Sequence, residues 1–596
     1  MGKVIDARLK LEERRKQQGS NCEVPTAPIC ECCSLHAADT YYVDNKNSET
    51  KLFTGIDQKE SNDVQELVII GAGPHALSLL LRLLEPEPDL LSDKERHLQA
   101  DYRQRMRPLG QVRRHVRDLL KGPKATLRQN DRLDPPFLSP DMIKNKVTVI
   151  DASGSKWMAT WDQNFSTLDI PHLRSPIAAH ADPYDHRALE FFADHQKRSD
   201  ELIDLNFVPK KIGRWDFHGP YNVPSTSVFS EFHKKLTEAY GIADIVKNGR
   251  VQSIKVRPPL VDSGEPLFDL EIIDRTGRVS TVTTKRVVCA MGPATSAKNN
   301  EFLWEETLRQ QILSNTYGNP AKTSSMNEFE NDKIDDHFSR YVLHTHDIIP
   351  WLVSTAKQPE LSSPKRRILI VGGGITSGHL ALLASNPSKS PWCSSVALIQ
   401  RSQILERQFD IPTQWMGPAR GKLQDEFRSL PPEARVKRIK EERRGGSISP
   451  EVLKELKKRE QSGHLNMKVE VEIESVEFVN GALEVFLSDD SVLEVDMIWL
   501  ATGFAINVSN YPCLHDLQSV LPIETVHGLP VLNPDLSWGT DDQNTPESWK
   551  TQARKRLWIM GALAGLELGP DALNLMGARQ GAVRVAQAIL ADLGAP

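Results

Sequence analysis

The sequence lacks the features of several large protein classes. It has only seven cysteines in 596 residues, too few for a disulfide-rich secreted scaffold. No apolar run approaches the roughly 18 residues of a membrane-spanning helix, so we expect no membrane span. The net charge of −5 gives no basic surface for nucleic acid. The N-terminus has no apolar core of a secretory signal, and a cytoplasmic location is therefore expected.

The N-terminal segment is polar and has little periodicity. Residues 1–61 are predicted to form a disordered tail. Cys30, Cys32 and Cys33 cluster in this tail, but no second pair follows at the spacing of a zinc site. We therefore expect no metal, and a metal or lipid site remains the alternative interpretation of the cluster.

The most informative stretch is the apolar run at 68–70, which leads into a glycine turn and then a helical pattern. A buried parallel strand meets a helix in this way at a dinucleotide site. Gly71 permits the tight turn, Gly73 lets a pyrophosphate approach the backbone, and Ala76 lets the helix pack closely. The helix N-terminus offers N–H groups to the phosphates. A turn that binds nothing is the alternative.

A second copy of the pattern follows much later in the chain. The apolar run at 367–371 leads into Gly372 and Gly374, and Ser377 takes the third small position. The chain is also too long for one core. Two such turns in one chain indicate two dinucleotide sites.

The strands after the two turns end in different residues. The strand at 146–150 ends at Asp151 after a long insertion, and an acid there accepts hydrogen bonds from ribose hydroxyls. The strand at 395–400 ends at Arg401, and an arginine accommodates the 2′-phosphate that an acid would repel. We therefore expect NADP at the second site. The alternatives are an acidic turn residue and a surface arginine.

Three further positions are candidates for binding or catalysis. Arg174 and Asn222 lie in two irregular segments that are dense in aromatic and turn residues, and such segments often line a ligand site. Asn574 lies near the start of the C-terminal helix, whose N-terminus can stabilise negative charge on a cofactor. Packing around a loop is the alternative interpretation of the two irregular segments.

The order of these motifs resembles that of the class B flavin monooxygenases, especially the lysine/ornithine N-hydroxylase-like branch. The two glycine motifs precede Ala501-Thr502-Gly503-Phe504, which is similar to the ATG-Tyr signature of that group. The resemblance implies FAD at the first glycine turn and NADPH at the second, with Thr502 and Gly503 beside a cofactor.

The same resemblance implies a reaction. NADPH would deliver hydride to FAD, and the reduced flavin would react with molecular oxygen to give a C4a-hydroperoxide. A small substrate, an amine, would take the distal oxygen atom. Asn222 is the candidate counterpart of an active-site asparagine in this group, and it is therefore the candidate catalytic residue.

The predicted fold class is α/β, with two Rossmann-like dinucleotide-binding domains and helical insertions. An FAD-binding domain is expected at 62–345 and 496–596, and an NAD(P)-binding domain at 346–495. Insertions are expected at 86–145, whose arginines would form a solvated face, and at 299–338, which reads as a loop or surface segment. The alternating pattern at 251–288 predicts an antiparallel meander.

Other functions of the same fold stay open. An NAD(P)H oxidase or dehydrogenase would carry the same motifs, and a flavin-binding regulatory protein would keep the fold without turnover. A dithiol–disulfide reductase needs a cysteine pair near the flavin, whereas Cys32 and Cys33 lie in the tail. A Baeyer–Villiger fingerprint would need glycine at Arg340 and tryptophan at Ile348, so ketone oxygenation is disfavoured.

Overall fold

The computed structural model describes residues 64–85, 88, 107–122, 140–205, 219, 221–259, 264–292, 302–317, 337–357, 365–417, 419–539 and 548–594. The predicted tail at 1–61, with its cysteine cluster, lies outside the described residues. Within them, Cys289, Cys393 and Cys513 are free thiols. No helix in these ranges is both long enough and apolar enough to cross a membrane.

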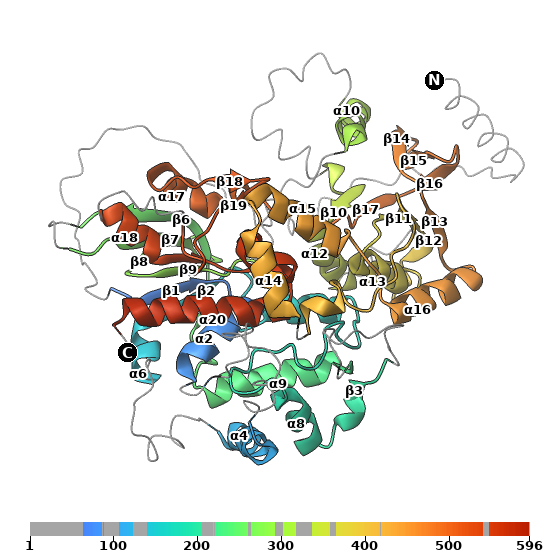
Figure 1. The fold of residues 1–596 in the computed structure, drawn as a ribbon. Coiled ribbons are helices and arrows are strands. Elements are labelled where there is room, and N and C mark those ends of the chain that lie inside the picture. The colour runs from blue at the N-terminus through green and yellow to red at the C-terminus, as the bar shows by residue number, and fades with distance from the viewer. Residues whose placement is uncertain are drawn as a thin grey trace, which may run out of the picture.

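A five-stranded parallel sheet, the first sheet, lies at the left of Figure 1. Its order is β20-β9-β1-β2-β5, and every neighbouring pair is parallel. β1 and β9 are buried along their whole length, as expected of apolar strands in a sheet that is covered on both faces. The strands are β1 (Leu67–Ile70), β2 (Val147–Asp151), β5 (Val246–Asn248), β9 (Val287–Cys289) and β20 (Leu557–Ile559).

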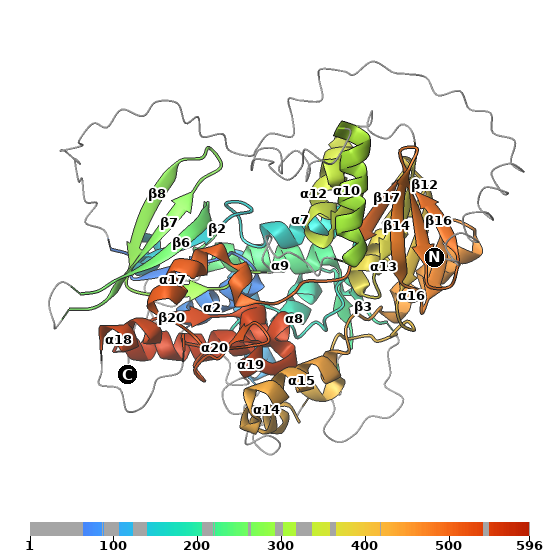
Figure 2. The same cartoon turned by 90° about the horizontal axis from the view of Figure 1, so that it is seen from above.

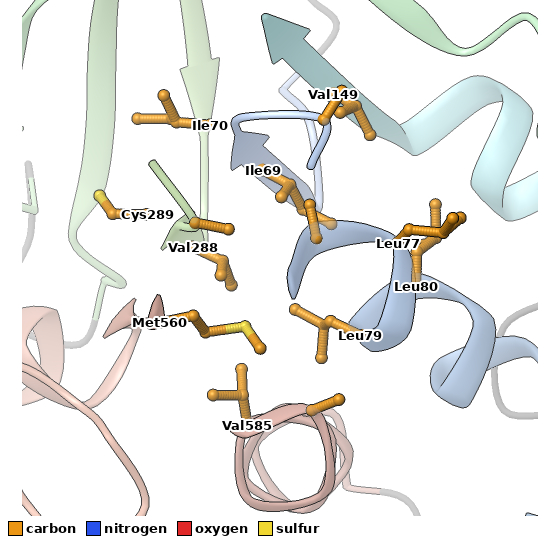
Figure 3. Packing of buried hydrophobic residues seen from close by; sticks show 14 of the residues in the cluster. Ile69, Ile70, Leu77, Leu79, Leu80, Val149, Val288, Cys289, Met560 and Val585 are labelled. Carbon is orange, nitrogen blue, oxygen red and sulfur yellow. The ribbon is translucent and has the colours of Figure 1, made fainter. Parts of the chain in front are cut away.

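Helices cover one face of the first sheet and a meander covers the other. The helices α2 (Pro74–Leu84) and α20 (Leu575–Asp592) pack together on the sheet, and Figure 3 shows Leu79 and Val585 facing Met560. The expected antiparallel meander lies on the opposite side (Figure 1). Its strands are β6 (Arg250–Arg257), β7 (Leu267–Ile273) and β8 (Val279–Thr284).

A second parallel sheet lies beside the first in both views (Figures 1 and 2). Its order is β10-β17-β11-β12-β13, again with parallel pairing throughout. The helices α13 and α16 pack against each other beside it, and a small antiparallel sheet, β14-β15-β16, follows in the chain. The elements are β10 (Val342–His344), α12 (Thr345–Lys357), β11 (Arg366–Val371), α13 (Ile375–Ala384), β12 (Cys393–Gln400), α16 (Pro450–Gln461), β13 (Asn466–Val469), β14 (Ile473–Val479), β15 (Ala482–Leu487), β16 (Val492–Val495) and β17 (Met497–Leu500).

The expected domain boundaries at 345 and 495 need correction. They assign β10 and β17 to the first domain, but both strands pair in the second sheet, where Leu500 lies opposite Val371 and His344. β17 therefore takes the place beside β11 that β9 takes beside β1. Parallel pairing joins strands that are distant in the sequence, so the local apolar pattern of 497–500 does not reveal which sheet it enters.

Both predicted insertions contain helices. The first holds α4 (Leu109–Lys121), on which Arg113, Arg114 and Arg117 are exposed as expected, and α6 (Pro140–Lys146). The second holds α10 (Leu303–Tyr317), so the expectation of a loop or surface segment is wrong over this range. Trp304 and Leu308 of α10 are buried in a core that includes β14 and β15, and this burial outweighs the polar composition of the segment.

A helical segment after β12 reaches across to the first sheet. The helices α14 (Arg420–Ser429) and α15 (Pro432–Arg443) contact α19 (Gly565–Leu568) and the short 3-10 helix η11 (Gly569–Leu573), as the lower centre of Figure 2 shows. Arg420 donates to Gln580 at 3.0 Å, and Arg435 pairs with Glu567 at 2.5 Å. The remaining elements are α7 (Ala159–Thr167), α8 (Ala188–His195), β3 (Leu202–Ile203), β4 (Val223–Pro224), α9 (Thr226–Ala239), α17 (His515–Val520), β18 (Thr525–Val526), β19 (Leu529–Pro530) and α18 (Trp549–Lys555).

Candidate dinucleotide sites

The first glycine turn connects β1 to α2 and lies against the end of β9. Gly71 has a φ of +101°, and a Cβ there would come within 2.5 Å of the carbonyl oxygen of Ala290. The N–H of Gly71 donates to Ile150 at 2.7 Å, and the N–H of Ala290 donates to Ile70 at 2.9 Å. Only glycine fits both this backbone conformation and this close approach.

Gly73 and the N-terminus of α2 form an open face. A Cβ placed on Gly73 would meet nothing within 4 Å. No side chain caps α2, so the N–H groups of its first turn are left for a ligand. Ala76 is 0% exposed, which lets α2 pack closely on the sheet. The result is a cradle that a phosphate group fits.

Asp151 ends β2 beside this turn. Its Oδ2 atom accepts a hydrogen bond from the N–H of Ala72 at 2.8 Å, and its Oδ1 atom accepts one from Ser153 at 2.7 Å. The structure therefore brings Asp151 to the glycine turn despite the long insertion before it. Each oxygen keeps a lone pair that can accept a hydrogen bond from a ribose hydroxyl.

The second glycine turn repeats these contacts. A Cβ on Gly372 would collide with the carbonyl oxygen of Ala501. The N–H of Gly372 donates to Ile399 at 3.0 Å, and the N–H of Ala501 donates to Val371 at 2.9 Å. Each contact has its counterpart at the first turn, with β17 in the place of β9.

Small residues hold α13 against its neighbours. Ser377 is 0% exposed, and its hydroxyl donates to the carbonyl of Gly374 at 2.7 Å. A Cβ on Gly378 would come within 2.9 Å of Val452 on α16. Ser377 therefore takes the third small position, as the sequence predicts, and Gly378 permits the contact with α16.

The end of β12 differs by one residue from the sequence prediction. The strand registers align Gln400, not Arg401, with Asp151. Gln400 is 6% exposed, its Oε1 atom lies beside Gly373, and its Nε2 atom has no hydrogen-bond partner among the described residues. Arg401 follows it with an exposed side chain. The uncharged amide of Gln400 thus takes the place that the carboxylate of Asp151 has at the first turn. Arg401 lies one residue further along, at the surface beside the second turn.

A loop of the chain covers the second turn. A Cβ on Gly446 would come within 2.7 Å of the Cα atom of Gly374 and within 2.8 Å of its nitrogen. A Cβ on Gly374 would in turn lie 3.6 Å from the Cα atom of Gly446. The face that is open at Gly73 is therefore occupied at Gly374, and this is the main difference between the two turns.

Arg174 holds the same loop from the first part of the chain. Its guanidinium donates to the carbonyls of Arg407 at 2.6 Å and Gln408 at 2.7 Å and to the hydroxyl of Ser447 at 2.8 Å. Burial lowers the pKa of Arg174 to about 10, so the side chain keeps its charge at neutral pH. These contacts bind the guanidinium to the backbone beside the second sheet, and its contact with a cofactor stays a prediction.

Asn222 and the Ala501-Thr502-Gly503 segment lie in loops. The Nδ2 atom of Asn222 donates to the carbonyl of Leu202 at 3.3 Å, which fixes the loop before β4. Thr502 and Gly503 are exposed directly after β17, and a Cβ on Gly503 would meet nothing within 4 Å. The catalytic assignment of Asn222 stays a prediction.

Asn574 is the N-cap of α20. Its Oδ1 atom accepts a hydrogen bond from Gly577 at 3.0 Å, and its Nδ2 atom donates to Asp571 at 3.1 Å. Capping is the usual role of asparagine at this position. The geometry gives Asn574 a structural role, and its contact with a cofactor stays a prediction.

No family profile matches the sequence, and no curated protein matches it. Solved structures do match. The ornithine N-hydroxylase KtzI of Kutzneria sp. 744 superposes with a TM-score of 0.55 at 15% identity, over 89% of this chain and 100% of that one. The ornithine hydroxylase PvdA of Pseudomonas aeruginosa gives 0.54 at 14% identity with the same coverage. The cadaverine monooxygenase DfoA of Erwinia amylovora gives 0.53 at 13% identity, over 90% and 96%.

The chain has the fold of the ornithine N-hydroxylases. The resemblance that the glycine motifs indicate is confirmed for the fold. The superposition covers nearly the whole length of each solved structure named above.

Two residues at the second glycine turn are not predicted from the sequence. Gln400 is missed because strand register cannot be seen in a single sequence. Gly446 is missed because its contact with Gly374 joins distant segments, although the Gly445-Gly446 pair is a local turn signal inside a charged helical stretch. No cluster of three or more potential metal ligands occurs among the residues that the structure describes.

Proposed function

We propose that the chain binds FAD at the first glycine turn and NADPH at the second, and that it hydroxylates a small amine with molecular oxygen. The observation that carries the proposal is the repetition of one turn geometry at the ends of two parallel sheets. In both sheets the strand that leads into the glycine turn, β1 or β11, lies between the next strand of the chain, β2 or β12, and a later strand, β9 or β17. Doubly wound dinucleotide-binding domains have this arrangement.

The first turn fits FAD. The open face at Gly73 and the N–H groups of α2 would hold the pyrophosphate, and Asp151 would hold the ribose. FAD, when bound, supplies hydride acceptance and oxygen activation. The protein would position the cofactor, because Gly71 and Ala76 hold the turn and the helix α2 against the sheet.

The second turn fits NADPH in every respect but one. Gly372, Gly374 and Ser377 reproduce the turn, and the uncharged Gln400 leaves the strand end free of the carboxylate that would repel a 2′-phosphate. Arg401 is exposed at the rim, where it would pair with that phosphate. The exception is Gly446, which lies where the pyrophosphate would approach Gly374.

The amine substrate is inferred from the solved structures with this fold. KtzI is solved with reduced FAD, NADP⁺ and L-ornithine, and DfoA is solved with FAD as a cadaverine monooxygenase. From the same resemblance we assign Thr502 and Gly503 to the cofactor site and Asn222 to catalysis. Gly446 favours one alternative, a flavin-binding protein that does not turn over NADPH.

The test is the visible spectrum of the purified protein before and after NADPH is added without oxygen. The proposal expects bound FAD that NADPH bleaches faster than NADH does. A protein that takes up no FAD would overturn the proposal. A bound flavin that neither nucleotide reduces would favour the alternative without turnover.

A further inference from the structure

The two glycine turns of this chain differ at the position where a pyrophosphate approaches. A Cβ on Gly73 would meet nothing within 4 Å, whereas Gly374 is in contact with Gly446. Gly446 and a pyrophosphate group would occupy the same side of Gly374, because the second glycine of the turn is the one that the pyrophosphate approaches. The two cannot be there together.

The covering loop, residues 443–447, is held by two arginines. Arg407 donates from its side chain to the carbonyl of Glu442 at 3.0 Å, and its backbone N–H donates to Ile448 at 3.0 Å. Arg174, which belongs to the first part of the chain, donates to the hydroxyl and the carbonyl of Ser447. The loop is therefore fastened by Arg407 from the segment after β12 and by Arg174 from the first part of the chain.

The outer side of the loop faces solvent. Arg444, Gly445 and Gly446 are exposed, whereas Ser447 and Ile448 are buried. The exposed part of the loop can lift from Gly374 once the contacts of Arg174 with Ser447 and those of Arg407 at the base of the loop loosen.

We propose that the covering loop is an autoinhibitory lid over the second dinucleotide site. A dinucleotide binds there only after Gly446 leaves Gly374, and Arg174 couples this opening to the contact between the two halves of the molecule. The inference rests on the proposed function, because it takes the second turn as the NADPH site. The apparent dissociation constant rises as the fraction of open lid falls.

Two variants open the lid by different routes. Gly446→Ala places a methyl group against the backbone of Gly373 and Gly374, so the loop must move outward. Arg174→Gln removes the charged donors that fasten Ser447. Gly110→Ala is the matched control, since its Cβ would meet nothing within 4 Å on α4.

The experiment is a calorimetric titration of the FAD-loaded proteins with NADP⁺. We expect both lid variants to bind NADP⁺ at least about tenfold more tightly than the unaltered chain and the control to match the unaltered chain. Retained FAD reports that each variant is folded, and Arg174→Gln decides the question if Gly446→Ala fails to fold. Equal or weaker binding in the folded lid variants would overturn the lid.

Hydrogen exchange separates the lid from the proposed function. The N–H of Ile448 donates to Leu405 at 2.9 Å, so it should exchange faster when NADP⁺ binds, while amides at 373–378 become protected. Protection at 373–378 with no change at Ile448 would contradict the lid and leave the NADPH site in place. If no variant binds NADP⁺ while all keep FAD, both the lid and the NADPH site fail.

Discussion

A hydrogen bond of 2.8 Å joins the backbone N–H of Ala72 to the Oδ2 atom of Asp151. It ties the end of β2 to the first glycine turn across 79 residues of sequence and holds a carboxylate at the edge of the proposed FAD site. The relationship makes Asp151 a part of the turn as well as the proposed ligand of the ribose.

Asp151→Ala should therefore weaken FAD binding by about tenfold or more, because a charge-assisted hydrogen bond contributes roughly 1.5–3 kcal/mol. Asp151→Asn keeps an acceptor for Ala72 and should have a smaller effect. Flavin fluorescence during titration with FAD measures both dissociation constants. Unchanged FAD affinity in Asp151→Ala would exclude Asp151 from the site.

Substitutions at the first turn should separate binding from stability. Gly73 has a φ of −82° that any residue adopts, and its Cβ would point into open space. Gly73→Ala should keep the melting temperature and weaken FAD binding by about tenfold. Gly71→Ala should instead lower the stability by roughly 1–3 kcal/mol, because of its positive φ and the collision with Ala290. Thermal melts in the absence of FAD and FAD titrations distinguish the two effects, and full FAD affinity in Gly73→Ala would contradict the assignment.

Arg401 should decide between NADPH and NADH. Loss of a guanidinium–phosphate contact predicts that Arg401→Ala lowers the rate of flavin reduction at limiting NADPH by about tenfold to a hundredfold and leaves the rate with NADH unchanged. Arg401→Lys keeps the charge without the planar fork and should lie between the two. Stopped-flow absorbance without oxygen gives the rates. Equal losses with both nucleotides would show that Arg401 does not read the 2′-phosphate.

Stability should fall as the pH is lowered from about 6.5 to about 4. His233 accepts a hydrogen bond from the N–H of Ala181 at 3.1 Å and donates to the carbonyl of Phe229 at 2.7 Å, so its ring is neutral. Burial lowers its pKa to about 4, and the unfolded chain, with the ordinary value near 6.5, therefore binds more protons in this range. The effect is fully present below the folded pKa and amounts to roughly 3 kcal/mol.

Urea unfolding of the unaltered chain and His233→Gln at several pH values tests this point. The variant should lose less stability between pH 6.5 and 4 than the unaltered chain does. Equal pH dependence would show that His233 is protonated in the folded state.

The local features of the fold are readable from the sequence. An apolar strand, a glycine turn and a helix occupy adjacent residues, so the two turns and their small positions are predictable. Asp151 is also found, because β2 ends there even after the insertion. These features depend on the residues that form them, and little on distant partners.

Features that depend on distant partners are not readable in this way. The sheet membership of β17, the equivalence of Gln400 with Asp151 and the contact of Gly446 with Gly374 all join segments far apart in the chain. Arg174 illustrates the limit, because the sequence does not indicate that its guanidinium contacts the carbonyl of Gln408, 234 residues away. The burial of α10 likewise comes from a core that its own polar sequence does not indicate.

The most direct test of the proposed function measures products in air. The FAD-loaded protein and Gly446→Ala are incubated with NADPH and a small primary amine such as L-ornithine, L-lysine or cadaverine. NADPH consumption, hydroxylated amine and hydrogen peroxide are then quantified together. The account predicts that at least one amine raises NADPH consumption and yields hydroxylated amine in matching amount. Flavin-dependent NADPH consumption that gives only hydrogen peroxide with every amine would contradict the monooxygenase and leave an oxidase.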